Sequence, residues 1–159
     1  MRLALLTFGL LKAVPGDPQV QGFVALIDPV FAQAEASDGF LGLFGHLGVG
    51  RHRRPERWQG LEYAGRCVIV RSLWRDLDSL VAFARSGHHG EALRGSSEWI
   101  VHGDWPGSVA WWVDDEETPT VVDSLGRYDR LDREGSSPAA FSLSEPYDEL
   151  GARVSLTRR

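Results

Sequence analysis

The stretch that decides the fold runs from Trp74 to Val113 and reads WRDLDSLVAFARSGHHGEALRGSSEWIVHGDWPGSVAWWV. It opens at the end of a strand, and Asp76 stands where the following helix needs its N-cap. Apolar residues then recur at helical spacing until Gly87 breaks the helix, and residues 88–100 form a second helical piece. In the strand at 109–113, Trp111 and Trp112 point to opposite faces. Each face of the sheet must therefore cover a large aromatic ring.

The residues before this stretch predict further two-faced strands and a first helix. Residues 3–11 are apolar on both sides, which is typical of a strand buried on both faces. Helical spacing follows over 20–34, where Pro29 should kink the helix or split it in two, and Gly39 ends it. Strands are expected at 40–47, again apolar on both faces, and at 67–73. Between them, 48–65 is interpreted as a long excursion anchored by Trp58 and Tyr63.

The residues after this stretch predict one more helix and a tail. Apolar residues recur at helical spacing over 121–131 with Asp and Arg between them, which predicts an exposed amphipathic helix. We expect a single domain over residues 1–143 and a polar, partly mobile C-terminal tail over 144–159.

Composition restricts the class of protein. The chain has 159 residues, 43% of them hydrophobic and 25% charged, which indicates one soluble domain without a membrane span. The apolar N-terminus lacks a signal-peptide cleavage site and is interpreted as a strand. The single cysteine, Cys67, fits a reducing cytoplasm. A net charge of -5 argues against nucleic acid as a partner, and the arginine-rich segment 51–57 is interpreted as a solvated loop.

The predicted order of elements is strand, helix, strand, strand, helix, strand. This is the βαββαβ arrangement of ferredoxin-like α+β folds with an antiparallel sheet, here with an extra C-terminal helix. Its helices cover one face of the sheet only. Because a large exposed apolar face is rarely tolerated, a second copy is the simplest cover for the other face. The expected assembly is a homodimeric α+β barrel with an apolar cavity between sheet and helices in each protomer.

Several segments together resemble domain-of-unknown-function family number 3291, and the resemblance covers most of the chain. The segments that carry it are Gly22-Phe23, AEASDGF at 34–40, Ser72-Leu73-Trp74, His89 ten residues before Trp99, AWWV at 110–113, Pro119 and SPAAF at 137–141. The resemblance implies a dimeric α+β barrel related to the antibiotic biosynthesis monooxygenases.

The resemblance also implies a kind of chemistry. Some relatives of this barrel oxidise polycyclic phenols without a cofactor, in an apolar cavity where tryptophan, asparagine and histidine side chains stabilise a substrate carbanion. This chain departs from the family pattern at Phe31 and Val70, where asparagine is usual, and at Gly42-Leu43, where a tryptophan-arginine pair is usual. Any chemistry that depends on those polar groups does not carry over.

The candidate catalytic residues are His89, His88 and Arg71. A histidine can act as base or acid near neutral pH, although one at a helix break often only satisfies backbone groups. A guanidinium on a strand buried on both sides needs a partner, which an acidic helix residue could supply. The expected lining of the substrate pocket is Phe31, Gly42, Phe44, His46, Trp74, Trp99 and Trp112. For the tryptophans, ordinary core packing is the competing interpretation.

No metal site is predicted, because the histidines lack zinc-binding spacing. Haem stays open as an alternative, since some related barrels hold iron through a histidine on the second helix. The matching position here falls near Leu93, and the loop at 51–57 could meet the propionates. The leading hypothesis is a cytoplasmic homodimer that binds a small apolar or aromatic molecule and oxidises or isomerises it without a cofactor. A non-catalytic binding or scaffold protein is the further alternative.

Overall fold

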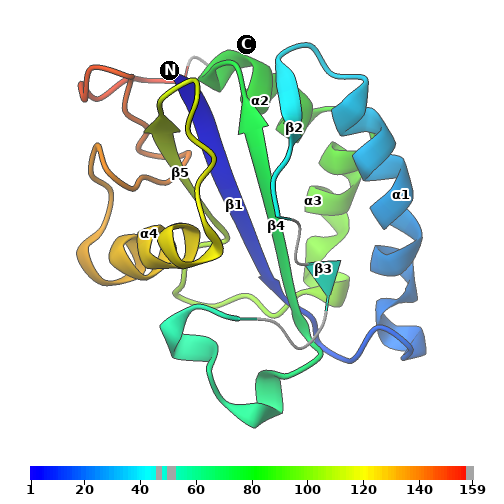
Figure 1. Cartoon of the computed structure of the whole chain (residues 1–159). Helices are drawn as coiled ribbons and strands as arrows, with labels where there is room; N and C mark the ends of the chain where they lie inside the picture. The colour runs from blue at the N-terminus through cyan, green and yellow to red at the C-terminus, as the bar shows by residue number, and fades with distance from the viewer. Residues whose placement is uncertain (46–47, 50–52, 157–159) are drawn as a thin grey trace.

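The computed structural model describes residues 1–45, 48–49 and 53–156 (Figure 1). The elements follow in the order β1 (Arg2–Leu10), α1 (Gln21–Glu35), β2 (Phe40–Leu43), β3 (Gly48–Val49), β4 (Cys67–Trp74), α2 (Leu77–Arg85), α3 (Gly87–Trp99), β5 (Ser108–Val113) and α4 (Val121–Glu134). Short 3-10 helices lie at Pro18–Val20, Glu56–Trp58 and Leu61–Tyr63. The chain is therefore an α+β protein, as its sequence predicts.

The strands form one antiparallel sheet in the order β2-β4-β1-β5, and the short β3 also pairs with β4. The first strand, β1, lies in the middle of the sheet because it pairs with β4 on one side and β5 on the other. Residues that pair across antiparallel strands share a face. Leu3 is paired with both Trp74 and Trp112, so these three side chains lie on one face, and Trp111 lies on the other. The predicted two-faced character of β1, β4 and β5 is confirmed.

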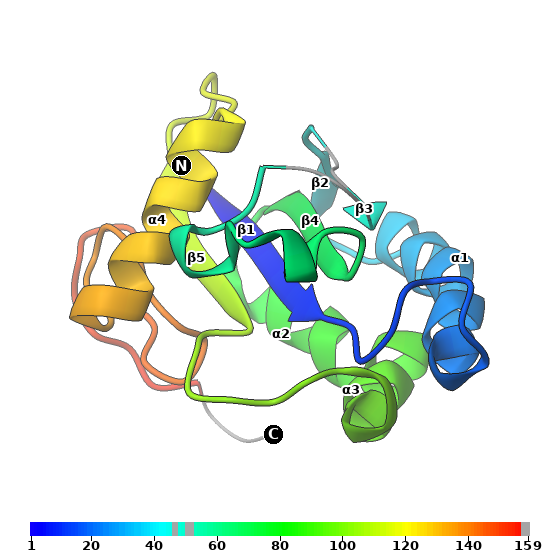
Figure 2. The same cartoon turned by 90° about the horizontal axis from the view of Figure 1, so that it is seen from below.

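One face of the sheet is covered by α1, α2 and α3, and we call it the three-helix face (Figure 2). Asp76 begins α2 as predicted, accepting a hydrogen bond from the backbone N–H of Ser79 at 2.7 Å. The buried core on this face consists of Leu3, Leu5, Ala34, Trp74, Leu80, Phe83, Ala110 and Phe141.

The opposite face, which we call the α4 face, is covered by α4 and by the 3-10 helices at 56–63 (Figure 2). Leu125, Tyr128 and Leu131 recur along α4 and are buried against the sheet. The sequence predicts α4 as an exposed helix, whereas in the structure α4 covers the sheet face that a second copy was expected to cover. Trp58 is buried in the same core, so its predicted role as an anchor of the excursion is confirmed.

Residues 144–156, predicted as a polar tail, fold back against β5. Tyr147 and Arg153 form an isolated bridge, and the indole N–H of Trp112 donates to the carbonyl of Tyr147 at 2.8 Å. The ring of Phe141, which belongs to the buried core, lies 6.0 Å from the Tyr147 ring. The polar composition of this segment concealed these contacts, because most of them use backbone groups and one aromatic side chain.

Pro29 does not split the first helix, which continues from Gln21 to Glu35, and the alternative of a kink stays a prediction. Ala25, whose carbonyl loses its helical hydrogen-bond partner to Pro29, is an exposed residue that water can reach. Of the strand expected at 40–47, β2 comprises Phe40–Leu43, and residues 46 and 47 lie outside the described residues. Leu41 is 48% and Leu43 is 40% exposed, because β2 is an edge strand with a register shift beside Gly42. Within the described ranges, no helix combines the length and the apolar character needed to cross a membrane.

Candidate functional site

The candidate site is centred on His89, which lies in the first turn of α3 just after the junction with α2. Gly87 has a φ of +50°, a left-handed conformation that favours glycine and allows one helix to follow the other directly. The imidazole of His89 is half-buried and packs against Phe83, with ring centroids 4.6 Å apart. His88, the neighbouring candidate, is exposed and has its Nδ1 atom 3.6 Å from Glu91. His89 therefore turns toward the core, and His88 does not.

The hydrogen bond that His89 makes determines its tautomer. Its Nδ1 atom lies 2.9 Å from the carbonyl oxygen of Ala84. Because a carbonyl can only accept, Nδ1 carries a proton, and in the neutral ring Nε2 holds a lone pair. Burial lowers the pKa of His89, although the hydrogen bond to Ala84 opposes this shift. His89 is thus a neutral imidazole near pH 7 whose Nε2 is able to accept a proton.

Gln33 on α1 holds the helix junction from outside. Its side-chain oxygen accepts the backbone N–H of His89 at 3.0 Å, and its Nε2 donates to the carbonyl of Ser86 at 3.0 Å. These backbone groups belong to helix ends, which lack partners within their own helices. One amide side chain therefore positions the start of α3 relative to the end of α2. Sequence reasoning missed Gln33, because a lone glutamine in an amphipathic helix carries no signal of a contact 56 residues away.

Aromatic rings connect His89 to the core of the three-helix face. Phe83 lies 4.9 Å from Trp74, and Trp74 lies 5.1 Å from Phe40, measured between ring centroids. The indole N–H of Trp74 donates to the Ser72 hydroxyl at 3.0 Å, so its polar atom is satisfied inside the protein. Trp74 is 1% exposed, and its place in this row agrees with core packing. The structure thus brings together two predicted site residues, His89 and Trp74, through Phe83.

The three-helix face is less completely covered than the α4 face at the centre of the sheet. Thr7, Val68 and Val70 are half-buried there, although β1 and β4 are central strands. The next residues along the same strands, Phe8 and Ile69, face α4 and are at most 3% exposed. The apolar residues of α1 are half-buried as well, namely Phe23, Val24, Leu26, Ile27, Val30 and Phe31. Apolar surface that is only partly covered is what a small-molecule site on this face would use.

The remaining predicted lining residues are dispersed. Trp99 lies at the far end of α3, where its ring packs over Gly22 at the start of α1. Trp112 shares the three-helix face but donates its indole N–H to the carbonyl of Tyr147 in residues 144–156, which we call the C-terminal turn. Gly42 has a φ of +130° on the edge strand, with open space around its Cα. His46 lies outside the described residues.

Arg71 and Phe44 lie on the α4 face, so the sheet separates them from His89. Arg71 pairs with Leu6 across the sheet and is 2% exposed, with its guanidinium 4.8 Å from the Phe44 ring centroid. The group donates to the carbonyls of Gly45 and Pro119 and to the Ser124 hydroxyl, at 2.7, 3.3 and 3.2 Å. All of these partners are neutral, so backbone and hydroxyl oxygens take the place of the acidic helix residue that the sequence analysis considered as a possible partner.

The structure offers little for a metal or for haem at the predicted positions. Leu93 is 54% exposed on α3 and has no ligating atom, so this position does not fit an iron ligand. Arg57, from the segment considered for propionates, is already bonded to Asp104 at 2.7 Å and to Asp132 at 3.0 Å. The described part of the chain contains no group of three or more His, Cys, Asp or Glu residues placed to hold a metal ion.

The comparisons with known proteins identify the family. The family described as "Domain of unknown function (DUF3291)" matches residues 2–156, so the chain belongs to it. This match extends through the C-terminal turn. No functionally curated protein matches the chain in sequence.

Solved structures share the fold at low sequence identity. Rv0793 from Mycobacterium tuberculosis is 14% identical, with a TM-score of 0.51 over 74% of this chain and 100% of that one. The NE2512 protein of unknown function from Nitrosomonas europaea is 13% identical, with a TM-score of 0.50 over 75% of this chain and 95% of that one. A conserved protein from Methanosarcina mazei Go1 is 21% identical, with a TM-score of 0.46 over 65% and 85% of the two chains. At these identities the likeness to Rv0793 and to NE2512 concerns the fold alone.

Proposed function

We propose that this member of the DUF3291 family binds a small apolar or aromatic molecule on the three-helix face of its sheet, with His89 as the reactive group. The observation that carries the proposal is the state of the His89 ring. Its Nδ1–H is held by the Ala84 carbonyl, and its Nε2 is left as a base in an apolar, half-buried setting. The half-buried residues of β1, β4 and α1 supply the apolar surface around such a ligand.

The reaction that suits this arrangement is proton removal from an acidic carbon of a phenolic or enolic substrate. Nε2 takes the proton, and the electron pair stays on the substrate as a resonance-stabilised carbanion. Return of the proton at another carbon is an isomerisation. Reaction of a methylene carbanion with dioxygen gives a carbonyl group and one water, so that CH₂ and O₂ become C=O and H₂O. The second outcome is the cofactor-independent monooxygenase reaction, and neither outcome requires Arg71.

The finer fold assignment belongs to this proposal. The strand order β2-β4-β1-β5 and the position of α1, α2 and α3 on one face support a ferredoxin-like arrangement. The argument for a homodimeric barrel is weakened, because α4 covers the face that a second copy was expected to cover. A cytoplasmic location is likewise proposed from the single, buried cysteine.

Anthrone, a polycyclic substrate with an acidic methylene group, is the probe for the test. Binding is followed by NMR shifts of the His89 region, and turnover is followed by oxygen uptake. We expect His89→Ala to lower turnover by roughly a hundredfold or more while anthrone still binds. His88→Ala is the matched control and should leave turnover unchanged. Equal turnover in the wild type and His89→Ala would reject the role of His89, and binding without turnover in the wild type would identify a non-catalytic binding protein.

A further inference from the structure

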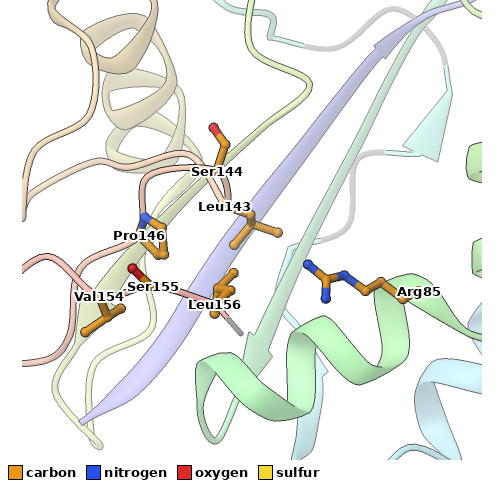
Figure 3. A pocket seen from close by; sticks show the side chains of 7 residues that line it. All are labelled: Arg85, Leu143, Ser144, Pro146, Val154, Ser155 and Leu156. Atoms are coloured by element: carbon orange, nitrogen blue, oxygen red, sulfur yellow. The ribbon is translucent and has the colours of Figure 1, made fainter. Parts of the chain in front are cut away.

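A cleft of about 380 Å³ lies between α2 and the C-terminal turn (Figure 3), and His89 is not among the described residues that line it. Its lining consists of Arg85, Leu143, Ser144, Pro146, Val154, Ser155 and Leu156. A smaller hollow of about 250 Å³ shares Ser144, Pro146, Val154 and Ser155 with it and continues along the turn. The larger cleft falls at the lower end of the range of about 300–1,000 Å³ that is usual for small-molecule sites.

The walls of the cleft are held in place by the surrounding structure. The backbone N–H of Val154 donates to the carbonyl of Pro146 at 3.0 Å, which joins the two arms of the turn. Leu143 packs against the buried core of the three-helix face. The Trp112 indole holds Tyr147, between the arms, to β5. These contacts fix the backbone of the turn and the position of Leu143, so this wall of the cleft is part of the folded structure.

Arg85 is the charged side chain among the described residues that line the larger cleft. Arg85 extends from the last turn of α2 toward Leu143 and Leu156 (Figure 3). None of the described residues that line the larger cleft carries a carboxylate side chain. Among the described residues, the Arg85 side chain has neither a hydrogen bond nor an ion pair, whereas nearby Arg153 is bonded to Glu145 at 3.1 Å and to the Tyr147 hydroxyl at 3.2 Å. In a chain with a net charge of -5, this is an unneutralised cation beside an apolar wall.

We propose that this cleft binds a carboxylate that carries a short apolar chain. The planar guanidinium of Arg85 matches a carboxylate in a two-point contact, which an ammonium cannot reproduce. Leu143, Val154 and Leu156 supply the apolar wall for the chain, and the Ser155 hydroxyl is a further donor at the rim. This proposal goes beyond the function proposed for His89 and does not depend on it.

The test uses octanoate as the probe, with 1-octanol and acetate as comparisons, against the full chain labelled with ¹⁵N. We expect octanoate to shift the amide signals of residues 143–146 and 153–156 in a saturable way, and to bind more tightly than either comparison compound. Arg85→Ala should weaken octanoate binding by roughly tenfold, and Arg85→Lys should restore only part of the loss. Arg94→Ala is the matched control and should bind octanoate like the wild type. Arg94 is an exposed arginine on α3 whose side chain has no hydrogen-bond partner among the described residues.

Four outcomes would overturn the proposal. Octanoate shifts that map to another surface would reject the cleft as the site. Equal binding by Arg85→Ala and the wild type, with both spectra folded, would reject the role of the guanidinium. Equal binding of octanoate and 1-octanol would reject a carboxylate ligand, while equal binding of octanoate and acetate would reject the apolar chain. None of these results alters the expectation for His89→Ala on anthrone.

Discussion

His89 is half-buried and Arg71 is fully buried, and the loss of contact with water acts on these two ionisable residues in different ways. For His89, burial lowers the pKa, so the ring is neutral near pH 7 and is able to accept a proton. Desolvation also lowers the pKa of Arg71, but a guanidinium remains protonated at any ordinary pH and must be satisfied by its surroundings. The carbonyl of Gly45 accepts a hydrogen bond from the Arg71 guanidinium. Gly45 has a φ of +52°, and a Cβ on this residue would collide with the guanidinium. The site role proposed for one residue and the structural role of the other follow from this difference.

The pKa of His89 makes stability depend on pH. Because the folded pKa lies below the ordinary 6.5, the unfolded chain binds this proton more tightly. The contribution of the neutral ring is complete above the unfolded pKa and is lost as pH falls from there through the folded pKa. We expect urea unfolding between about pH 8 and 5 to show the stability gap between the wild type and His89→Ala shrinking as pH falls. An NMR titration midpoint of His89 above 6.5 would contradict the expectation.

Substitutions of Arg71 test whether it belongs to the site. Arg71→Lys leaves a charge buried without the fork that reaches both Gly45 and Pro119, so we expect it to destabilise more than Arg71→Met, by about 1–3 kcal/mol. Urea unfolding measures the difference. Because the sheet separates Arg71 from His89, anthrone binding to a folded variant should match that of the wild type. If a stable Arg71 variant bound anthrone but lost turnover, Arg71 would have to take part in catalysis.

At the scale of elements, the junction of α2 and α3 decides where His89 points. The chain has no loop between these helices, only Ser86 and the left-handed Gly87. Three groups then bind the exposed ends of the two helices, namely the Gln33 side chain, the His89 ring and the Ser86 hydroxyl, which donates to the carbonyl of Phe83 at 3.4 Å. The junction is held by side-chain contacts, so its geometry depends on α1 as well as on the local sequence.

Replacing two helical glycines, Gly87 and Gly126, by alanine should change the free energy of unfolding in opposite directions. A Cβ on Gly87 would require a strained φ and would lie 2.7 Å from the Gln33 side-chain oxygen, so Gly87→Ala should destabilise by about 1–2 kcal/mol. Gly126, within α4, has open space around its Cα, so Gly126→Ala should stabilise by about 0.5–1 kcal/mol. Thermal or urea unfolding of the two variants gives both signs. A stabilised Gly87→Ala protein would contradict the left-handed junction.

At the scale of the whole molecule, the sheet is covered on both faces by one chain. The α4 face buries Trp111, Tyr128 and Leu131 without a second copy. Arg57 joins the segment at 56–63 to α4 through Asp132, so the two parts of this cover also contact each other. The homodimer expected from the sequence stays a prediction, and a dimer formed without moving α4 would have to use another surface.

Substitutions of Tyr128 test how far α4 stabilises the sheet that it covers. Its ring is fully buried, and its hydroxyl donates to the carbonyl of Pro106 at 2.7 Å. We expect Tyr128→Phe to cost about 1 kcal/mol for the hydrogen bond and Tyr128→Ala about 3–5 kcal/mol for the cavity. Urea unfolding measures both. Light scattering should give the same molar mass for Tyr128→Phe and the wild type, and a change of mass would indicate that this face takes part in an interface between copies.

The sequence by itself determined the strands, the helices and the faces on which most side chains lie. Successive side chains of a strand point to opposite faces, so the predicted strands also show which of their residues share a face, and local signals such as Asp76 and Gly87 decide where helices begin and break. The prediction failed where local pattern carries no information. An edge strand and a buried strand have the same composition, so the exposure of Leu41 and Leu43 could not be anticipated.

Only the tertiary structure decided which of these residues meet. It turned His89 inward and left His88 exposed, because the Ala84 carbonyl and the Phe83 ring stand beside only one of them. It placed Arg71 on the opposite face from His89, satisfied by carbonyls that no residue type reveals. It also brought α4 onto the sheet and the C-terminal turn onto β5. These outcomes depend on packing between segments far apart in the chain, and residue patterns within each segment do not contain that information.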